Sequence, residues 1–392
     1  MRPPVSIVAA ITVVVSILRH AEAAEATGNR RLRKLEDIVV YEDARYYAAF
    51  PSIVQRPDGE LLVAFRRAPE RRAFDPAGTS HTDANSQLVL VRSADLGQTW
   101  SREPQLIAAH PFGGSQDPCM VQLRNGSILC SSYVWAPLPP PAIALLKQPV
   151  ASSGNFAFLG GYLTRSRDGG RSWSSPIVPA SCPGEANLDI FGKPLPAYNR
   201  GAMCEGKDGR LYWVVAATST NSPTRTGTHL LISANQGDTW NYSCPVAVDP
   251  KVEFNETSLF ETPKGDLVAF LRSENFNDHT CVARSKDHGR SFAWQDAGFQ
   301  GHPHHAIRLP DQRVLLVYGY RHPPFGVRAR VLDAECTNAA NAEEIILRDD
   351  GSNGDLGYPW ATLVSKDRVL VVYYFNSTNG TRQIAGTYLQ IP

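Results

Sequence analysis

An eight-residue pattern occurs four times in this chain and limits what the chain can fold into. Its clearest copy, Ser-Arg-Asp-Gly-Gly-Arg-Ser-Trp, occupies residues 166–173, and the others occupy residues 93–100, 233–240 (Asn for Asp) and 285–292 (Phe for Trp). The Asp suits a tight turn because its carboxylate accepts hydrogen bonds from nearby N–H groups. The Gly supplies a position with positive φ, and the aromatic residue can pack onto a core. Copies about 50–75 residues apart indicate an array of supersecondary units.

Hairpin patterns repeat at the same spacing. Each of six units has an apolar run, a turn such as Asp58-Gly59 or Asp208-Gly209, and a second apolar run, which predicts β-hairpins. Units one to four add a third and a fourth strand around the eight-residue pattern, whereas units five and six keep a third strand without it. Six four-stranded units predict an all-β, six-bladed β-propeller over residues 38–392. We expect residues 38–41 to supply the outer strand of blade six.

The N-terminus has the features of a secretion signal. Arg2 precedes an apolar run from Val5 to Leu18, and Ala21-Glu22-Ala23 follows it, which is the order of regions in a signal peptide. The apolar run is short for a transmembrane span. We expect a signal peptide at residues 1–23, a basic leader at 24–37, and a secreted, periplasmic or extracellular monomer with no transmembrane segment.

The net charge and the cysteine content limit which partners, disulfides and metals the chain can have. The net charge of +1 does not favour nucleic acid. Seven cysteines are an odd number, so at least one is free or pairs between chains. Cys119 and Cys130 flank the turn at Asn125-Gly126 and are either a cross-hairpin disulfide or two small buried residues. No spacing of cysteines or histidines proposes a metal, and we expect no cofactor.

Aligning the repeats predicts a ring of side chains. In a propeller the first strand of each blade runs along the central channel, so equivalent positions lie on one face. The residues before these strands are Phe50, Asp117, Arg200, Glu256, His302 and Tyr358. The second strands end on the same face at Arg66, Tyr133, Ala216, Arg272 and Tyr374, with Arg321 slightly further on in unit five. Two acids, several arginines and phenols in one ring predict a ligand site.

The residue types suggest what this site binds. Arg66, Arg272 and Arg321 can clamp a carboxylate with paired N–H donors. Glu256 and Arg272 lie on the two arms of one hairpin and are expected to be neighbours. Tyr358 can approach Glu256 across the channel, and a phenol that loses its proton to a carboxylate can attack carbon. The neutral phenol avoids the repulsion that a carboxylate nucleophile would meet at an anionic sugar.

The long loop at residues 68–86 supplies candidate proton donors. It contains Asp75, His81 and Asp83. A carboxylic acid in this loop can protonate a leaving oxygen.

The repeated octet resembles the Asp-box, and the whole pattern resembles the exo-α-sialidase (neuraminidase) family of six-bladed propellers. The matching segments are Asn255-Glu256-Thr257-Ser258, Phe270-Leu271-Arg272 and Gly357-Tyr358-Pro359. The resemblance implies hydrolysis of a terminal acidic sugar, sialic acid or a related 2-keto-3-deoxy acid, from a glycan. It also implies retention of configuration through a Tyr nucleophile, an exception to the two-carboxylate scheme.

The same resemblance assigns roles to residues. It implies Tyr358 as nucleophile, Glu256 as its base and Arg272 as a member of an arginine triad. It implies Asp83 as the acid/base, with Asp75 as its rival. We expect a set of substrate-binding residues around these: Arg66, Arg272, Arg321, Asp117, His302 and Arg200.

Departures from the family indicate a divergent member. Where the family has an Arg, the segment Ala49-Phe50-Pro51 has none, so Arg45 or Arg66 substitutes or the triad is incomplete. The blade-five Arg is displaced to Arg321 or Arg328. Two other functions stay open. One is a hydrolase or lyase acting on another glycan, with His302 or His81 doing acid/base work. The other is a non-catalytic propeller that binds a glycan or a protein.

Several of these residues also have a purely structural alternative. Tyr358 can pack beneath Trp360, Arg66 can pair with Glu70, and Asp117 can cap the following strand. His302, beside a proline, can be an ordinary loop residue.

Overall fold

The structure is a computed structural model that describes residues 31–73, 81–146, 152–153, 156–189, 191–221, 225–376 and 380–392. The expected signal peptide (residues 1–23) and Asp75 lie outside the described residues. The described part is almost entirely β-structure, with a 3-10 helix η1 (Arg71–Ala73) and a short helix α2 (Pro140–Ile143). No helix in this part is long and apolar enough to cross a membrane.

The strands form six antiparallel sheets, which are the blades of a propeller. Blade one contains β2 (Tyr46–Gln55), β3 (Leu61–Pro69), β4 (Gln87–Ser93) and β5 (Gln105–Ala108). Blade two contains β6 (Gly114–Ser115), β7 (Cys119–Gln122), β8 (Ile128–Pro137), β9 (Ser152–Ser153) and β10 (Phe156–Ser166). Blade three contains β11 (Cys204–Glu205), β12 (Leu211–Thr218), β13 (Thr226–Ser233) and β14 (Asn241–Ala247).

The second half of the chain repeats this order. Blade four contains β15 (Phe254–Glu261), β16 (Leu267–Ser273), β17 (His279–Ser285) and β18 (Ala293–Gln300). Blade five contains β19 (His304–Arg308), β20 (Val314–Tyr320), β21 (Gly326–Leu332) and β22 (Glu344–Arg348). Blade six contains β23 (Gly357–Ser365), β24 (Arg368–Asn376), β25 (Arg382–Gln390) and the N-terminal strand β1 (Arg33–Tyr41). The predicted six-bladed fold is confirmed.

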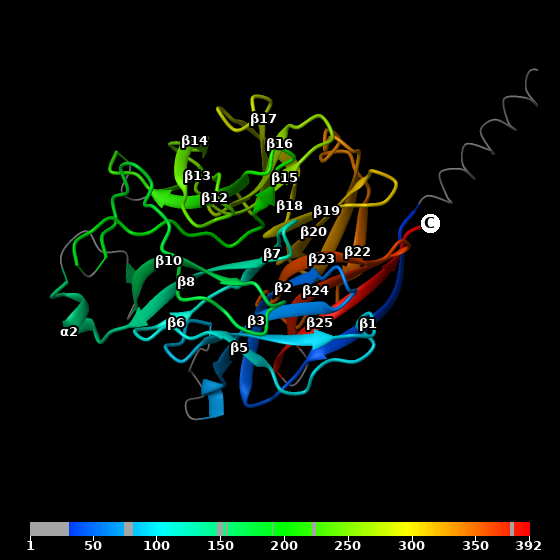
Figure 1. Cartoon of the computed structure of the whole chain (residues 1–392), viewed down its shortest axis with the longest axis horizontal. Coiled ribbons are helices and arrows are strands. Elements are labelled where there is room, and N and C mark those ends of the chain that lie inside the picture. Colours follow the sequence, from blue (N-terminus) through cyan, green and yellow to red (C-terminus); the bar gives the residue numbers. More distant parts are fainter. Residues whose placement is uncertain are drawn as a thin grey trace, which may run out of the picture.

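The ring closes where the two ends of the chain meet. Strand β1, blue in Figure 1, pairs antiparallel with the red β25, as expected for residues 38–41. The strand begins earlier than expected, so residues 33–37 belong to the blade and not to a leader. These residues are mostly exposed because they form the outer edge of the blade. A polar edge strand carries no apolar alternation, which is why the sequence did not indicate it.

The four octets form the same turn in each of the first four blades. In the copy at residues 166–173, Ser166 Oγ accepts the Gly170 N–H (2.7 Å), while Asp168 accepts Ser172 N–H (2.9 Å) and Ser172 Oγ–H (2.5 Å). The residue before the Gly that all four copies share has positive φ in every copy: Leu96, Gly169, Gln236 and His288. The octets therefore hold the turn between the third and fourth strands.

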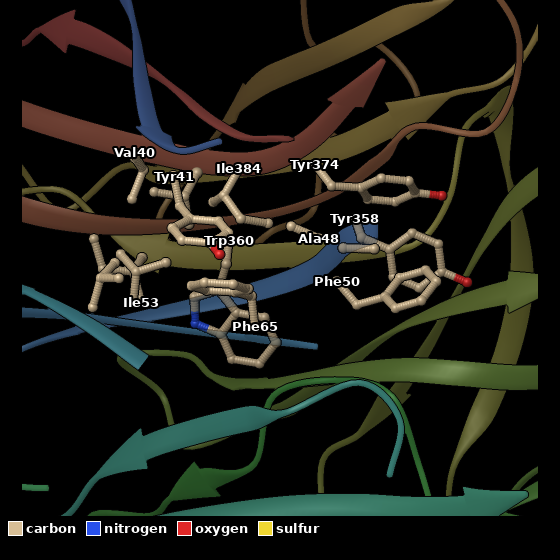
Figure 2. Close-up of a cluster of buried hydrophobic side chains, with 14 of the residues drawn as sticks. Val40, Tyr41, Ala48, Phe50, Ile53, Phe65, Tyr358, Trp360, Tyr374 and Ile384 are labelled. Carbon is tan, nitrogen blue, oxygen red and sulfur yellow. The ribbon is translucent and has the colours of Figure 1, made fainter. Parts of the chain in front are cut away.

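The core is divided among the blade interfaces. Six buried apolar clusters fill the six contacts between neighbouring blades. Figure 2 shows the cluster between blades six and one, where Phe65 and Ile53 meet Ile384 and Trp360. Each blade therefore buries apolar side chains against both neighbours, so closure of the ring completes the core.

The seven cysteines all lie within the described residues and none of them forms a disulfide. Cys119 pairs in register with Ser131, and Met120 with Cys130. The two cysteines are therefore offset by one residue and point to opposite faces of the hairpin. Of the two interpretations left open, the structure has the pair of small buried residues.

Candidate active site

The ring positions coincide with breaks in the inner strands. Register shifts interrupt the pairing around Phe50, Glu256 and Tyr358. Phe50, Asp117 and Tyr358 have φ values of 58°, 27° and 53°, which are unfavourable for residues other than glycine. Bulges of this kind re-aim side chains, and local strain of this kind clusters at functional sites.

Tyr358, Glu256 and Arg272 form the centre of the site. Tyr358 Oη donates a hydrogen bond to Glu256 Oε1 (2.7 Å), and Arg272 Nη1 lies 2.7 Å from Glu256 Oε2. Arg272 Nη1 also donates to Tyr358 Oη (3.1 Å), and its Nη2 lies 2.9 Å from Glu274 Oε1. The structure thus brings together a phenol, a carboxylate and a guanidinium from blades six and four. The predicted approach of Tyr358 to Glu256 is present.

Their electrostatics hold the phenol protonated and the carboxylate ionised. Burial and the negative charge of Glu256 raise the pKa of Tyr358. Burial alone would raise the pKa of Glu256, but the Arg272 charge and the Tyr358 hydroxyl outweigh it and lower that pKa. The pair is therefore a neutral phenol beside an ionised carboxylate at neutral pH.

Arg321 joins this centre from blade five. Its Nη2 donates to Tyr374 Oη (3.0 Å) and its Nε to the Leu356 carbonyl (3.1 Å). Its guanidinium carbon lies 4.9 Å from the centre of the Tyr358 ring. Arg321 thus donates to two neutral oxygens, whereas Arg272 already faces two carboxylates. Arg321 is therefore the better placed of the two to receive an added anion.

Arg66 lies among aromatic rings of blade one. It is fully buried, and its guanidinium lies over the rings of Tyr47 (5.5 Å) and Phe50 (5.8 Å). Burial lowers the pKa of Arg66, against the raising effect of Tyr47 and Asp117. Arg66 thus lies over Phe50, whereas Arg272 and Arg321 contact the hydroxyl and the ring of Tyr358. Glu70, the alternative partner of Arg66, pairs with Arg72 (2.8 Å).

Phe50 fills the space beside Tyr358. The Phe50 ring meets the rings of Tyr358 (4.7 Å) and Tyr374 (5.0 Å) edge-on. Figure 2 shows these three side chains pointing to the same side, away from Trp360. An apolar ring thus lies at the ring position of blade one, next to the place where the family pattern has an Arg.

Arg200 runs beneath the site. It is buried, and its Nη2 donates to the Pro51 carbonyl (3.0 Å). Its guanidinium carbon lies 5.3 Å from the Tyr358 ring centre and 4.9 Å from the Trp360 ring centre. This geometry makes Arg200 a support for Tyr358, although the sequence predicted a contact with substrate.

Asp117 is a buried acid in the same channel. Tyr133 Oη donates to its Oδ2 (3.1 Å), while Oδ1 is buried without a hydrogen-bond partner among the described residues. Burial raises the pKa of Asp117 to about 6, against the lowering effect of Arg200. A carboxyl group with an unused oxygen in a channel is suited to bind a substrate hydroxyl.

His302 lies between β18 of blade four and β19 of blade five. Its Nε2 is 3.3 Å from Asp278 Oδ1, and His322 Nε2 is 3.1 Å from Asp278 Oδ2. Burial lowers the pKa of His302, and Arg272 and Arg321 lower it further against the effect of Asp278. His302 is therefore a neutral part of the channel wall. Sequence reasoning missed Asp278, which occupies a hairpin turn with positive φ.

Asp83 is held by a neighbour in its own loop. Arg71 Nε and Nη2 donate to its two oxygens (2.6 and 3.1 Å), and the Asn85 N–H donates to Oδ1 (2.7 Å). Both oxygens of Asp83 are thus engaged and buried. This arrangement gives Asp83 a structural role in the loop and does not favour the acid/base role that the family resemblance implies.

Asp355 is a site residue that sequence reasoning missed. Tyr374 Oη (2.9 Å), Tyr47 Oη (2.8 Å) and Arg382 Nε (2.9 Å) all donate to its carboxylate. His81 Nδ1 lies 3.8 Å away. Its only sequence signal is its place three residues before Tyr358.

An aromatic cavity opens beside Glu256. Its volume is about 200 Å³, and its apolar wall consists of Tyr133, Trp135, Phe158 and Tyr198. A larger hollow of about 600 Å³ lies on blades four and five, but none of its lining residues belongs to the ring. The smaller cavity is therefore the one associated with the reactive groups, and aromatic walls suit the apolar face of a sugar.

Solved sialidases share this fold at low identity. A Hadza microbial sialidase is 17% identical and covers 88% of this chain and 66% of its own, with a TM-score of 0.64. The Trypanosoma rangeli sialidase is 14% identical and covers 91% of this chain and 58% of its own, with a TM-score of 0.60. This chain thus spans about two thirds or less of either protein, and the likeness concerns the fold alone.

A nearer relative has the same architecture over its whole length. It is a protein of unknown function from Dyadobacter fermentans, 57% identical, covering 92% of this chain and 99% of its own, with a TM-score of 0.89. No curated protein matches the chain. The sequence profile of the BNR repeat-like domain matches residues 150–371, which is more than half of the chain. The chain therefore belongs to the BNR repeat-like domain family.

Proposed function

We propose that this protein is a retaining exo-glycosidase that removes a terminal acidic sugar, sialic acid or a related 2-keto-3-deoxy acid, from a glycan outside the cytoplasm. The observation that carries the proposal is the contact between Tyr358 and Glu256 at 2.7 Å, with Arg272 bound to both. The sialidase-like fold supports the same class of reaction.

Tyr358 and Glu256 act together in the first step of the reaction. Glu256 accepts the phenol proton as Tyr358 Oη attacks the anomeric carbon, giving a glycosyl–tyrosine intermediate that water later hydrolyses. Because the phenol is neutral, it approaches an anionic sugar without charge repulsion. Arg272 binds the Glu256 carboxylate and the phenol oxygen, so it orients both groups.

The acidic group of the sugar is assigned to Arg321 and Arg272. Arg321 is buried against Tyr358 and Tyr374, and an added carboxylate there would gain charge-assisted hydrogen bonds. The site has two convergent arginines beside Tyr358, and Phe50 takes part of the space. We expect affinity for the carboxylate to be lower than a three-arginine clamp would give.

The test is hydrolysis of a fluorogenic sialic-acid glycoside by the purified protein and by Tyr358→Phe. We expect release by the wild type, severe loss in the variant, and mass spectra of a trapped intermediate that place the sugar on the Tyr358 peptide. Release of the same rate by both proteins would exclude the tyrosine nucleophile. No release by folded wild-type protein, with this glycoside and with other 2-keto-3-deoxy glycosides, would exclude the proposed activity.

A further inference from the structure

Arg200 is a buried positive charge that forms no ion pair among the described residues. It is 3% exposed, and its guanidinium donates to the Pro51 carbonyl (3.0 Å) and to Cys119 Sγ (3.3 Å). Its Nε is buried and has no hydrogen-bond partner in the described part of the chain. An arginine stays charged in a protein, and taking such a charge out of water is costly unless an acid compensates it. A charge kept at this cost is a candidate for a functional role.

The Arg200 charge is held against the proposed nucleophile. The guanidinium carbon lies 5.3 Å from the centre of the Tyr358 ring and 4.9 Å from that of the Trp360 ring. Both distances are within the range at which a guanidinium is attracted to the face of an aromatic ring. Arg200 Nη2 also donates to the Tyr358 carbonyl oxygen at 3.5 Å. Arg200 therefore contacts Tyr358 through both its ring and its backbone.

The charge of the Tyr358–Glu256 pair changes during the proposed reaction. In the free enzyme the pair carries one negative charge, on Glu256, because the phenol keeps its proton. In the glycosyl–tyrosine intermediate the pair is neutral, since Tyr358 Oη is bonded to the sugar and Glu256 holds the proton. The negative charge returns as the bond to Tyr358 breaks in the second step. A fixed cation beside the pair therefore lowers the barrier of the second step, whereas in the first step the charge is present from the start.

Arg200 is better suited to this task than the other arginines beside Tyr358. Arg272 already faces two carboxylates, and Arg321 is assigned to the acidic group of the sugar. Arg200 is too deeply buried to meet the sugar, so its charge acts on the pair alone. Burial lowers the pKa of Arg200, but neighbouring side chains, Glu256 and Tyr358 among them, outweigh this effect.

We propose that Arg200 is a positioning residue for the second half of the reaction, and that its buried charge favours the departure of Tyr358 from the sugar. The inference rests on the proposed glycosidase function. It goes further by giving a role in one step to a residue that does not touch the substrate. The Arg200 charge acts through the Tyr358 ring, together with the Arg272 N–H that donates to Tyr358 Oη.

The atoms and charges balance in this scheme. In the first step Tyr358 Oη forms a bond to the anomeric carbon, its proton passes to Glu256, and an aryl aglycone leaves as its phenolate. In the second step water attacks the same carbon, the bond to Tyr358 breaks, and the electron pair of that bond stays on Oη. Glu256 returns its proton to Oη, and the proton that the attacking water releases passes to solvent. The negative charge that develops on Oη is the charge that Arg200 stabilises.

The experiment measures the two steps separately in the full-length protein. A 3-fluoro glycosyl fluoride of the acidic sugar is given to the wild type, Arg200→Met, Arg200→Gln and Arg200→Lys, and the excess is then removed. Fluorine beside the anomeric carbon slows both steps, so the intermediate can be isolated and its breakdown followed. We expect breakdown to be about tenfold or more slower in the two neutral variants, and formation to change less than about threefold. Arg200→Lys keeps a charge and should lie between them and the wild type.

Arg330→Gln is the matched control. The Arg330 guanidinium carbon also lies over an aromatic ring, 4.1 Å from the centre of Phe299, but Arg330 does not belong to the ring of site positions. Both rates should therefore stay at the wild-type values in this variant. Thermal unfolding of every variant shows whether it is folded, and if Arg200→Met does not fold, Arg200→Gln and Arg200→Lys provide the comparison.

The outcomes separate this inference from the proposed function. Equal slowing of formation and breakdown in the folded neutral variants would indicate a merely structural role and overturn the inference, and so would unchanged breakdown. A wild type that cleaves an aryl glycoside but forms no intermediate would overturn the tyrosine nucleophile and, with it, this inference. A wild type that does neither would overturn the proposed function itself. Slower breakdown alone in the neutral variants of an active protein would support both.

Discussion

Replacing Asp117 by Asn should stabilise the protein at neutral pH. The native state raises the pKa of Asp117 from 3.8 to about 6, mainly because the carboxyl group is buried. The folded state therefore binds the proton more tightly than the unfolded state does. Stability from this group is fully present below about pH 4 and is lost as the pH rises through about 6. At pH 7 the ionised Asp117 consequently opposes folding.

The size of the effect follows from the shift. A change of about 2 pKa units, at 1.36 kcal/mol per unit, corresponds to about 3 kcal/mol. Asn keeps the shape of the side chain, and its carbonyl oxygen can still accept the hydrogen bond from Tyr133. We therefore expect Asp117→Asn to gain up to about 3 kcal/mol in the free energy of unfolding at pH 7, with no gain at pH 4.

Urea unfolding at pH values between 4 and 7 measures this difference. Asp278→Asn is a control of opposite sign, because its hydrogen bond with His302 lowers the pKa of Asp278. That variant should lose stability at pH 7 and approach the wild type as the pH falls. A gain for Asp117→Asn that does not depend on pH, or a loss at pH 7, would refute the assignment of Asp117 as a strained buried acid. A gain in stability with lost activity is the expected trade-off at a functional site.

Three further predictions concern the clamp, the core and the loop. Arg321→Met should lower kcat/KM for the acidic sugar by about 30-fold or more, which corresponds to the loss of a buried charge pair worth at least about 2 kcal/mol. Arg321→Lys should lower it less. Steady-state kinetics measures both, and an unchanged kcat/KM would contradict the binding of the substrate carboxylate by Arg321. Trp240→Ala should cost about 3–5 kcal/mol in urea unfolding, because Trp240 is buried 5.3 Å from the Trp213 ring. Asp83→Asn should lower kcat/KM on a disaccharide of the acidic sugar less than tenfold, because Asp83 is engaged by Arg71. A larger loss on the disaccharide than on a 4-nitrophenyl glycoside, whose leaving group needs no protonation, would restore the acid/base role of Asp83.

The fold and the ring could be predicted from the sequence because a propeller repeats one unit. The octets and turn dipeptides mark each repeat, and equivalent positions in the repeats must meet around the channel. This reasoning placed Tyr358 opposite Glu256 and Arg272 beside it, as the structure has them. It did not need side-chain detail, because the inner-strand ends share one face by topology.

The direction of each side chain could not be predicted in this way. Arg66 and Arg200 occupy ring positions as expected, but both guanidinium groups turn into buried aromatic surroundings. Which way a long side chain turns depends on its neighbours in other blades. Contacts between loops, such as His81 with Asp355, are separated by hundreds of residues and follow no repeat. The strand at residues 33–37 was missed because its sequence is polar.

The divergence of the site has a consistent physical pattern. Phe50 places an apolar ring beside Tyr358 at blade one. The nearby Asp355 carboxylate pairs with Arg382 and accepts hydrogen bonds from Tyr374 and Tyr47. The positive charge available to a substrate is thereby concentrated on blades four and five, at Arg272 and Arg321. A substrate carboxylate would then sit on the side of Tyr358 that faces these two arginines.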